Sequence, residues 1–275
     1  MEALSCFLEH RVNKLMELYL AGNPNVPPVD LREVAEASGV LSIEEREMIP
    51  EAVMNPGPAG FRIYLQSNFI DLPKMRVRRR FSLAHEIAHT LFYEFRDGAM
   101  RPVRKAPRGD SLETACHQGA RLLLVPQRSL TRELQRIKWP VGAEAVIELS
   151  RRFDVSVEVM LRRLHEVGAF KVAETALILV RRIETQDAFI VFAVYPPWLK
   201  ALLPTPSRGR TFASWLRQRS PDYRADPGVV DAIFEKGLQV QTAFGSLKVS
   251  PFSVTRSQHI FEFRIEDPSA MRVVV

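Results

Sequence analysis

The chain has 275 residues, of which 46% are hydrophobic and 25% charged, the composition of a soluble globular protein of two or three domains. Its two cysteines, Cys6 and Cys116, lie too far apart to indicate a disulfide scaffold, and no apolar run reaches the length of a membrane span. The first residues also lack the basic start of a signal peptide, so a cytoplasmic protein is expected. The net charge of +6 permits contact with nucleic acid or with an acidic protein but requires neither.

Two helices are predicted near the N-terminus. Residues 2–21 carry leucine and valine at helical spacing and stop before the helix-breaking Gly22-Asn23-Pro24. A second helix is expected over residues 31–38, because Asp30 is a favourable N-cap and Gly39 a favourable C-terminal stop. A proline-rich bend separates the two helices.

The next predicted element is a strand. Residues 55–58 hold two prolines and a glycine and are expected to form a loop, whereas residues 60–65 alternate apolar and polar side chains. If such a strand lies at the edge of a sheet, an extended peptide can pair with it.

The pattern His-Glu-x-x-His lies in residues 77–95, which contain no glycine or proline and repeat apolar side chains at spacings of three and four. A helix is therefore predicted here. His85 and His89 share one face of such a helix and can bind the same metal ion, whereas Glu86 is turned about 100° away. Its carboxylate can then reach a water on the metal without binding the metal itself. The alternative is a pair of partly buried histidines that are hydrogen-bonded within a core.

A second helix is expected to supply the third ligand. Residues 110–126 are predicted to form this helix, with Asp110 or Ser111 as its N-cap and a proline at its end. Glu113 and His117 lie four residues apart, so either can face the metal. Two histidines with a carboxylate and three histidines are both known zinc sets, and these ligands also suit Mn²⁺ or Fe²⁺. Zinc is the first choice of metal.

The two segments resemble the ImmA/IrrE family of bacterial metallopeptidases. The first matching stretch is Arg-Phe-Ser-Leu-Ala-His-Glu-Ile-Ala-His, residues 80–89. The second family motif, Glu-x-x-Ala-Asn-x-Phe-Ala-x-x-Leu-Leu-x-Pro, corresponds to residues 113–126, with Cys116, His117 and Gly119 in place of Ala, Asn and Phe. Beyond these segments the similarity is one of arrangement, and it is closer to the long radiation-response type of member than to the short phage type.

The resemblance implies a zincin-like zinc metallopeptidase domain in residues 1–126. By the motif match Glu113 is the third metal ligand, and His117 stays as the rival. Glu86 then acts as the general base in metal-assisted peptide hydrolysis and later gives the proton to the leaving amine. Tyr93, two turns beyond the first histidine on the predicted helix, is a candidate for stabilising the oxyanion; its alternative is a place in the core.

Residues 127–170 are predicted to form a helical module that resembles a helix-turn-helix. Its last helix carries Arg162 and Arg163 among acidic residues, a mixture less basic than expected of a dedicated DNA reader. Docking of a protein substrate or simple packing is therefore favoured over DNA binding, which stays open. The expected helices cover residues 130–137, 143–153 and 157–167, the last one capped by Ser156.

Residues 171–275 are predicted to form an antiparallel α+β domain with helices on one side. Its arrangement resembles the GAF-like domain of the long family members, which implies a regulatory or sensor role, although the sequence shows no ligand motif that would name a small-molecule effector. His259 is expected on a strand surface. The expected strands cover residues 175–180, 188–194, 237–242, 246–254 and 259–265, and the expected helices residues 211–219 and 227–236.

The predicted fold is thus that of an α+β multidomain protein with the boundaries given above. The resemblance implies a cytosolic metal-dependent endopeptidase that cleaves a helix-turn-helix transcriptional repressor and so induces a response to DNA damage or radiation. The alternative is a DNA-binding transcriptional regulator with a non-catalytic metal site and a ligand-sensing C-terminal domain. A structural zinc would need four protein ligands, and no fourth cysteine or histidine stands at recognisable spacing, which favours the enzyme. No membrane partner is expected.

Overall fold

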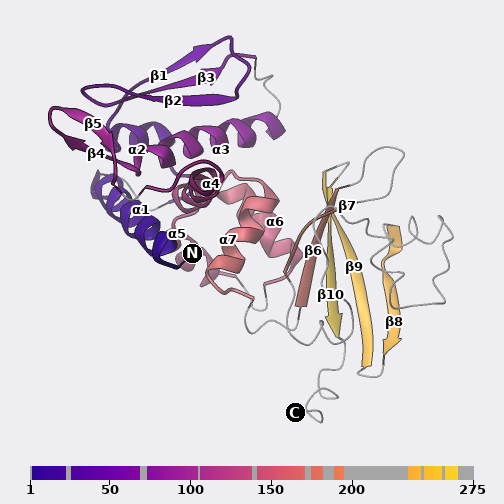
Figure 1. The fold of residues 1–275 in the computed structure, drawn as a ribbon. Coiled ribbons are helices and arrows are strands. Elements are labelled where there is room, and N and C mark those ends of the chain that lie inside the picture. Colours follow the sequence, from indigo (N-terminus) through magenta and orange to yellow (C-terminus); the bar gives the residue numbers. More distant parts are fainter. Residues whose placement is uncertain are drawn as a thin grey trace. The chain divides into compact units, whose positions relative to one another are not determined.

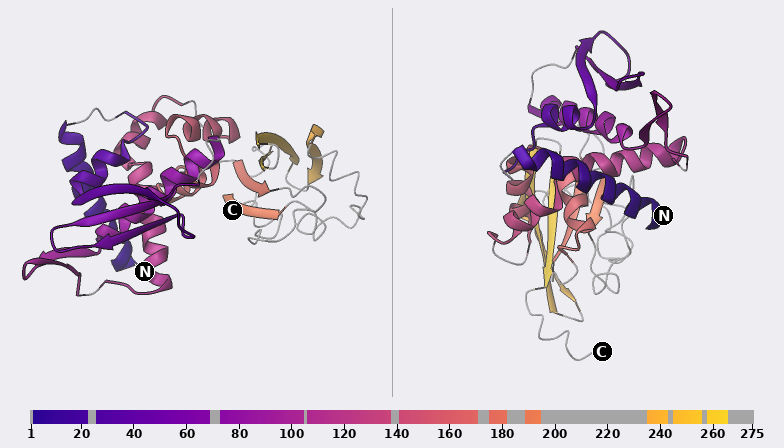
Figure 2. Two further views of the ribbon diagram at one scale, coloured as in Figure 1. Left: turned by 90° about the horizontal axis from the view of Figure 1, so that it is seen from above. Right: turned by 90° about the vertical axis from the view of Figure 1, so that its left-hand side faces the viewer.

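The computed structural model describes residues 2–22, 26–68, 73–104, 106–137, 141–170, 175–181, 189–194, 235–242, 245–255 and 258–265. They form a mixed fold of helices and strands (Figure 1, Figure 2). The chain separates into two compact units. Unit 1 holds Met1–Leu134 and Ser150–Ser156, and unit 2 holds Gln135–Leu149 and Val157–Val275. The three-domain division expected from the sequence concerns independent folding and stays a prediction.

One layer of unit 1 is a three-stranded sheet that lies against helix α3, Pro73–Thr90 (Figure 1). Its strands, in the spatial order β1-β3-β2, are β1 Val40–Arg46, β3 Phe61–Gln66 and β2 Ala52–Pro56. The central β3 runs parallel to β1 and antiparallel to β2. Three apolar side chains of β3 are buried while Arg62 between them is exposed, which is the alternation that predicts a strand here. β1 and β2 are the two edge strands.

Strands β1 and β2 have no clear pattern in the sequence. In β1 only Val40 is fully buried, and the strand ends in Glu44-Glu45-Arg46, so apolar and polar residues do not alternate. The sequence predicts a loop at Asn55 and Pro56, but both residues belong to β2, and that prediction is wrong. A proline is tolerated there because β2 is an edge strand and Pro56 is its last residue.

Helices α1 (Glu2–Gly22) and α2 (Leu31–Ala37) confirm the two predicted N-terminal helices. Asp30 caps α2, because its Oδ1 accepts hydrogen bonds from the backbone N–H groups of Arg32 (2.8 Å) and Glu33 (3.4 Å). α1 packs against α2 and against α4 (Asp110–Leu124). Within the described part of the chain, none of the helices combines the length and the apolar character needed to cross a bilayer.

Helix α3 carries the His-Glu-x-x-His pattern, but it ends at Thr90 and not at the predicted Phe95. The chain instead forms a hairpin of β4 (Tyr93–Arg96) and β5 (Ala99–Pro102). Asp97 and Gly98, between the strands, have φ angles of 52° and 73°. An Asp-Gly pair at positive φ is a strong hairpin signal, and it was available in the sequence.

The end of α3 is held by Arg11 of α1. The Arg11 Nε donates a hydrogen bond to the carbonyl oxygen of Leu91 (3.1 Å), and its Nη2 donates to that of Tyr93 (2.6 Å). These bonds fix the residues that directly follow α3 to the side chain of a residue on α1. The Asp97-Gly98 signal indicates that the helix must end before the hairpin, but the contact with Arg11, which lies far away in the sequence, is not visible in any local pattern.

Helix α4 crosses α3 at close range. Its N-cap is Gly109, at φ 53° and without a side-chain cap, so the predicted capping by Asp110 or Ser111 is wrong. Asp110 lies in the first turn instead, where a negative charge interacts favourably with the helix dipole. Gly119 permits the close crossing, since a Cβ added to it would lie 2.8 Å from the Cβ of Ala88 on α3.

Replacing Gly119 with Ala is therefore expected to separate α3 from α4. Overpacking a tight contact of this kind costs about 1–3 kcal/mol of unfolding free energy, and it should also weaken metal binding between the two helices. Urea unfolding and a metal titration would measure both effects. The double variant Gly119→Ala/Ala88→Gly removes the opposing Cβ and should recover most of the lost unfolding free energy and metal affinity. If the losses of the two single variants simply added in the double variant, the crossing would not depend on this contact.

Helices α5 (Gln127–Leu134), α6 (Ala143–Arg152) and α7 (Val157–Glu166) confirm the three predicted helices, with α5 beginning earlier than expected. The turn between α6 and α7, residues 153–156, belongs to unit 1 and is called here the α6–α7 corner. Its Asp154 pairs with Arg76 (Oδ1–Nη2, 2.7 Å) and with Arg80 (Oδ2–Nε, 3.3 Å). The corner is thereby fixed to the first half of α3.

Unit 2 contains a five-stranded sheet of order β7-β6-β10-β9-β8, in which every pairing is antiparallel, as the sequence predicts. The carboxylate of Glu262 on β10 accepts a hydrogen bond from the backbone N–H of Ala143 (2.8 Å) and so caps α6. The strands are β6 Thr175–Arg181, β7 Phe189–Val194, β8 Leu238–Thr242, β9 Gly245–Thr255 and β10 Gln258–Ile265.

Some predictions for this part of the chain have no counterpart among the described residues. The predicted helix 211–219 and nearly all of the predicted helix 227–236 lie outside them. His259 is a half-buried residue of β10, with its Nδ1 3.4 Å from the Oγ of Ser253. The likeness of residues 171–275 to a GAF-like domain stays a prediction.

Candidate metal centre

Three side chains from α3 and α4 converge on one point of unit 1. The Nε2 atoms of His85 and His89 lie 3.2 Å apart. The carboxylate of Glu113 reaches both, with its Oε2 3.1 Å from the Nε2 of His85 and its Oε1 3.7 Å from the Nε2 of His89. Two helices that approach each other closely at Gly119 thus bring together residues that are far apart in the sequence.

The spacing of these atoms fits a metal ion. A tetrahedral ion with bonds of about 2.0–2.1 Å holds its ligand atoms about 3.3 Å apart. The three donor atoms lie at nearly this separation, each within 4.8 Å of the others. Two imidazole nitrogens and a carboxylate form a nitrogen and oxygen set that suits zinc and also accepts manganese or iron. The residues present therefore fit a divalent metal ion with three protein ligands.

The site opens on the side of α4. The side chains of His85 and His89 are only 12% and 16% exposed, whereas that of Glu113 is 51% exposed. Burial, with smaller contributions from the neighbouring His89 and His117, lowers the pKa of His85 to about 4. Burial also lowers the pKa of His89. Both imidazoles are therefore neutral at pH 7 and can offer a lone pair to a metal.

Glu86 lies beside the three converging side chains and is not one of them. Its side chain is buried, and this burial raises its pKa to about 7. A hydrogen bond from the backbone N–H of Met54, on the edge strand β2, opposes the shift, while the charge of Glu113 adds to it. A carboxyl group with a pKa near neutrality can both take up and release a proton at physiological pH.

The raised pKa of Glu86 predicts a pH-dependent stability for the metal-free protein. Between pH 4.5 and 7 the unfolded chain loses the Glu86 proton while the folded chain still holds it, so this group's contribution to stability falls as the pH rises. Glu86→Gln removes the effect. In the presence of a chelator it should raise the free energy of unfolding by about 1–3 kcal/mol more at pH 8 than at pH 4.5. Urea titrations of the wild type and of Glu86→Gln at pH 4.5 and pH 8 would test this. If the two proteins differed in unfolding free energy by the same amount at both pH values, the prediction would be contradicted.

His117 lies next to the site but outside the converging set. Its Nδ1 donates a hydrogen bond to the backbone carbonyl of Glu113 (2.7 Å), and its ring packs edge-on against that of His85 at 4.6 Å between centroids. Phe81 contacts the same ring at 5.8 Å. The structure thus brings the Glu113 carboxylate, and not the His117 ring, to the two histidines of α3.

Tyr93 does not lie where the sequence predicts. It follows the end of α3 and begins β4, so it is not two helical turns beyond His85. Its ring packs edge-on against Phe61 at 5.5 Å, which fits the alternative role in the core. Cys116 is fully buried on α4, and this burial raises the pKa of its thiol, so the group stays protonated.

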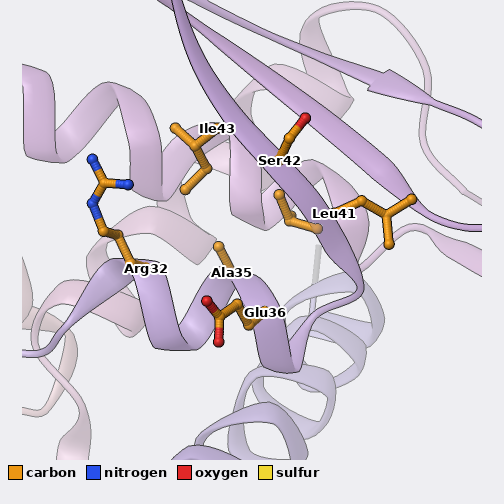
Figure 3. A pocket seen from close by; sticks show the side chains of 7 residues that line it. Arg32, Ala35, Glu36, Leu41, Ser42 and Ile43 are labelled. Carbon is orange, nitrogen blue, oxygen red and sulfur yellow. The ribbon is translucent and has the colours of Figure 1, made fainter.

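A separate pocket of about 110 Å³ lies between α2 and the edge strand β1 (Figure 3). Arg32 and Glu36 of α2 face Leu41, Ser42 and Ile43 of β1 across it. No residue of α3 or α4 lines it. The pocket therefore belongs to a different part of unit 1 from the metal site.

Comparisons with known proteins agree with the geometry. Residues 69–165 match the IrrE N-terminal-like domain of peptidase family M78. The chain is 40% identical over 93 residues to the radiation response metalloprotease IrrE of Deinococcus deserti, a match that covers 32% of either chain. This chain therefore matches about a third of the length of that curated relative.

A Mycobacterium tuberculosis transcriptional regulator of known structure is 14% identical, with a TM-score of 0.47, over 98% of this chain and 82% of that one. A similarity this low bears on no further argument. Over residues 69–165, which hold His85, His89 and Glu113, the chain is similar to the ImmA/IrrE family of metallopeptidases.

Proposed function

We propose that this protein is a metal-dependent endopeptidase. The observation that carries the proposal is the convergence of His85, His89 and Glu113 at ligand spacing beside the buried carboxyl group of Glu86. Zinc is the expected ion, with Mn²⁺ or Fe²⁺ as alternatives. A divalent metal held there supplies Lewis-acid catalysis, by polarising the scissile carbonyl and acidifying a water.

The protein's own groups then carry out the proton transfers and orient the reacting carboxylate. Glu86 takes a proton from the attacking water and gives it to the leaving amine, a role that its pKa near 7 supports. The hydrogen bond from Met54 orients the Glu86 carboxylate. Because Met54 lies on an edge strand, an extended peptide that pairs with β2 would pass close to Glu86.

The substrate we propose is a helix-turn-helix transcriptional repressor, whose cleavage would induce a response to DNA damage or radiation. Support comes from the family and from the name of the Deinococcus deserti relative, a radiation response metalloprotease. For residues 171–275 we propose a regulatory or sensor role. The protein is expected to act in the cytoplasm.

Direct DNA binding by the helical segment is the less favoured proposal. Arg162 on α7 is bonded to Glu158 (2.9 Å) and stacks over the ring of Phe192 on β7 at 4.4 Å. Arg163 is buried and pairs with Glu166 (3.5 Å). Both cations of the last helix are thus engaged within unit 2, which supports packing or protein docking more than contact with phosphates.

The proposal is tested by incubating the metal-loaded protein with the purified helix-turn-helix repressors of the host and identifying new peptide termini by mass spectrometry. Cleavage is expected with bound metal and is expected to stop with a chelator. Absence of cleavage in every repressor and in an unbiased peptide mixture would contradict an endopeptidase function. Cleavage of unrelated peptides but of no repressor would retain the enzyme and reject the substrate.

A further inference from the structure

Strand β5 and the segment that joins it to α4 carry arginines that have no ion-pair partner among the described residues. Arg101, Arg104 and Arg108 are all exposed, and within the described residues none of them forms an ion pair or a side-chain hydrogen bond. We call them the basic segment. By contrast, Arg76, Arg78, Arg79 and Arg80 on α3 each pair with an aspartate or glutamate of unit 1.

Both ends of the basic segment are fixed to elements that carry metal ligands. Val103, next to Arg104, donates its N–H to the carbonyl of Phe92 (2.8 Å), and Phe92 in turn donates its N–H to that of His89 (3.1 Å). At the other end the N–H of Glu113 donates to the carbonyl of Gly109 (3.1 Å). Arg108 therefore precedes Glu113 by five residues and directly precedes Gly109, the N-cap of α4.

The basic segment leads directly into the helix that carries the most exposed candidate ligand. Glu113 is the most exposed of the three candidate ligands, and it lies in the first turn of α4, directly after this segment. A residue two to four positions from a scissile bond lies about 7–13 Å from that bond in an extended chain, at about 3.3 Å per residue. The side chains of a bound peptide at those positions are therefore the ones that arginines near the site would be expected to meet.

We propose that the basic segment binds acidic side chains of the substrate, two to four residues from the bond that is cut. This inference rests on the endopeptidase function proposed above. Exposed arginines attract carboxylates over several ångströms and speed up their encounter, and both effects weaken as salt is added. Three arginines within eight residues form a patch the size of a short peptide, smaller than the track of cations that follows a nucleic-acid backbone.

The test compares peptides that share one cleaved core and differ only in carrying Asp and Glu, or Lys, at the positions two to four residues from the scissile bond. The wild-type protein with bound metal should cleave the acidic peptides about tenfold faster in kcat/KM at low ionic strength, and less so at high salt. The triple variant Arg101→Glu/Arg104→Glu/Arg108→Glu should reverse this preference. The single variant Arg104→Glu, which keeps most of the surface unchanged, should reduce it.

A matched control carries the same change of charge elsewhere in unit 1, as Arg32→Glu/Arg128→Glu/Arg151→Glu at three exposed positions. It should keep the acidic preference, and metal content should be equal in all variants. Cleavage without acidic preference, or a preference that survives in the basic-segment variants, would overturn the inference and leave the enzyme standing. Loss of duplex DNA binding in the triple variant, with an unchanged cleavage preference, would overturn it as well and assign the segment to nucleic acid. If the metal-loaded wild type cut no peptide, the proposed function itself would fall.

Discussion

Replacing Glu86 with Gln is expected to slow peptide cleavage by about 10²–10⁴-fold, the usual contribution of a general base. The amide keeps the size of the side chain but cannot take a proton from the attacking water. Metal content should stay the same, because Glu86 is not among the converging ligands. The measurement is a cleavage time course on protein of known metal content.

Two further results bear on this prediction. The variant His85→Ala should lose both metal and activity, which separates the assembly of the site from the chemistry that follows. A Glu86→Gln protein with full metal and wild-type cleavage would remove Glu86 from the mechanism. The histidine pattern would then return to a structural role.

Replacing Glu113 with Gln is expected to weaken metal binding by more than about 10²-fold, since even residues that only support a ligand are typically worth 10–100-fold. His117→Ala should change the affinity little, because its Nδ1 is engaged by the Glu113 carbonyl and its ring lies outside the converging set. Competition with chelators of known affinity measures both variants. The opposite ranking would transfer the ligand role to His117.

The parts of unit 1 that the sequence predicts well are those with strong local patterns. α1 and α2 have regular apolar spacing, and Asp30 marks the start of α2. β1 and β2 are not predicted from the sequence, because neither shows the alternation of apolar and polar residues that marks a strand. β1 ends in charged residues, and β2 ends in Asn55-Pro56. α3 is extended too far because Leu91, Phe92 and Phe95 continue the helical spacing, while the contact that ends the helix comes from α1.

The residues of the candidate site also fall into those that local patterns predict and those that they do not. His85 and His89 follow from helical spacing, and Glu86 from its rotation relative to them. Spacing does not choose between Glu113 and His117; family resemblance favours Glu113, and the crossing of α3 and α4 places its carboxylate at both histidines. The contact between Glu86 and Met54 depends on a strand that has no local pattern, so no sequence argument could have found it.

The α6–α7 corner limits where this chain can be divided into fragments. The chain leaves unit 1 at Leu134, contributes to unit 2, and returns at Ser150 to place Asp154 against Arg76 and Arg80. A fragment that stops at Leu134 would leave the largely buried Arg80 without its carboxylate, five residues before His85. A fragment that continues to residue 170 would keep the pair. Residues 1–134 are therefore not a complete unit that can be joined to a different C-terminal domain. Any chimaera that keeps unit 1 intact must also keep the α6–α7 corner.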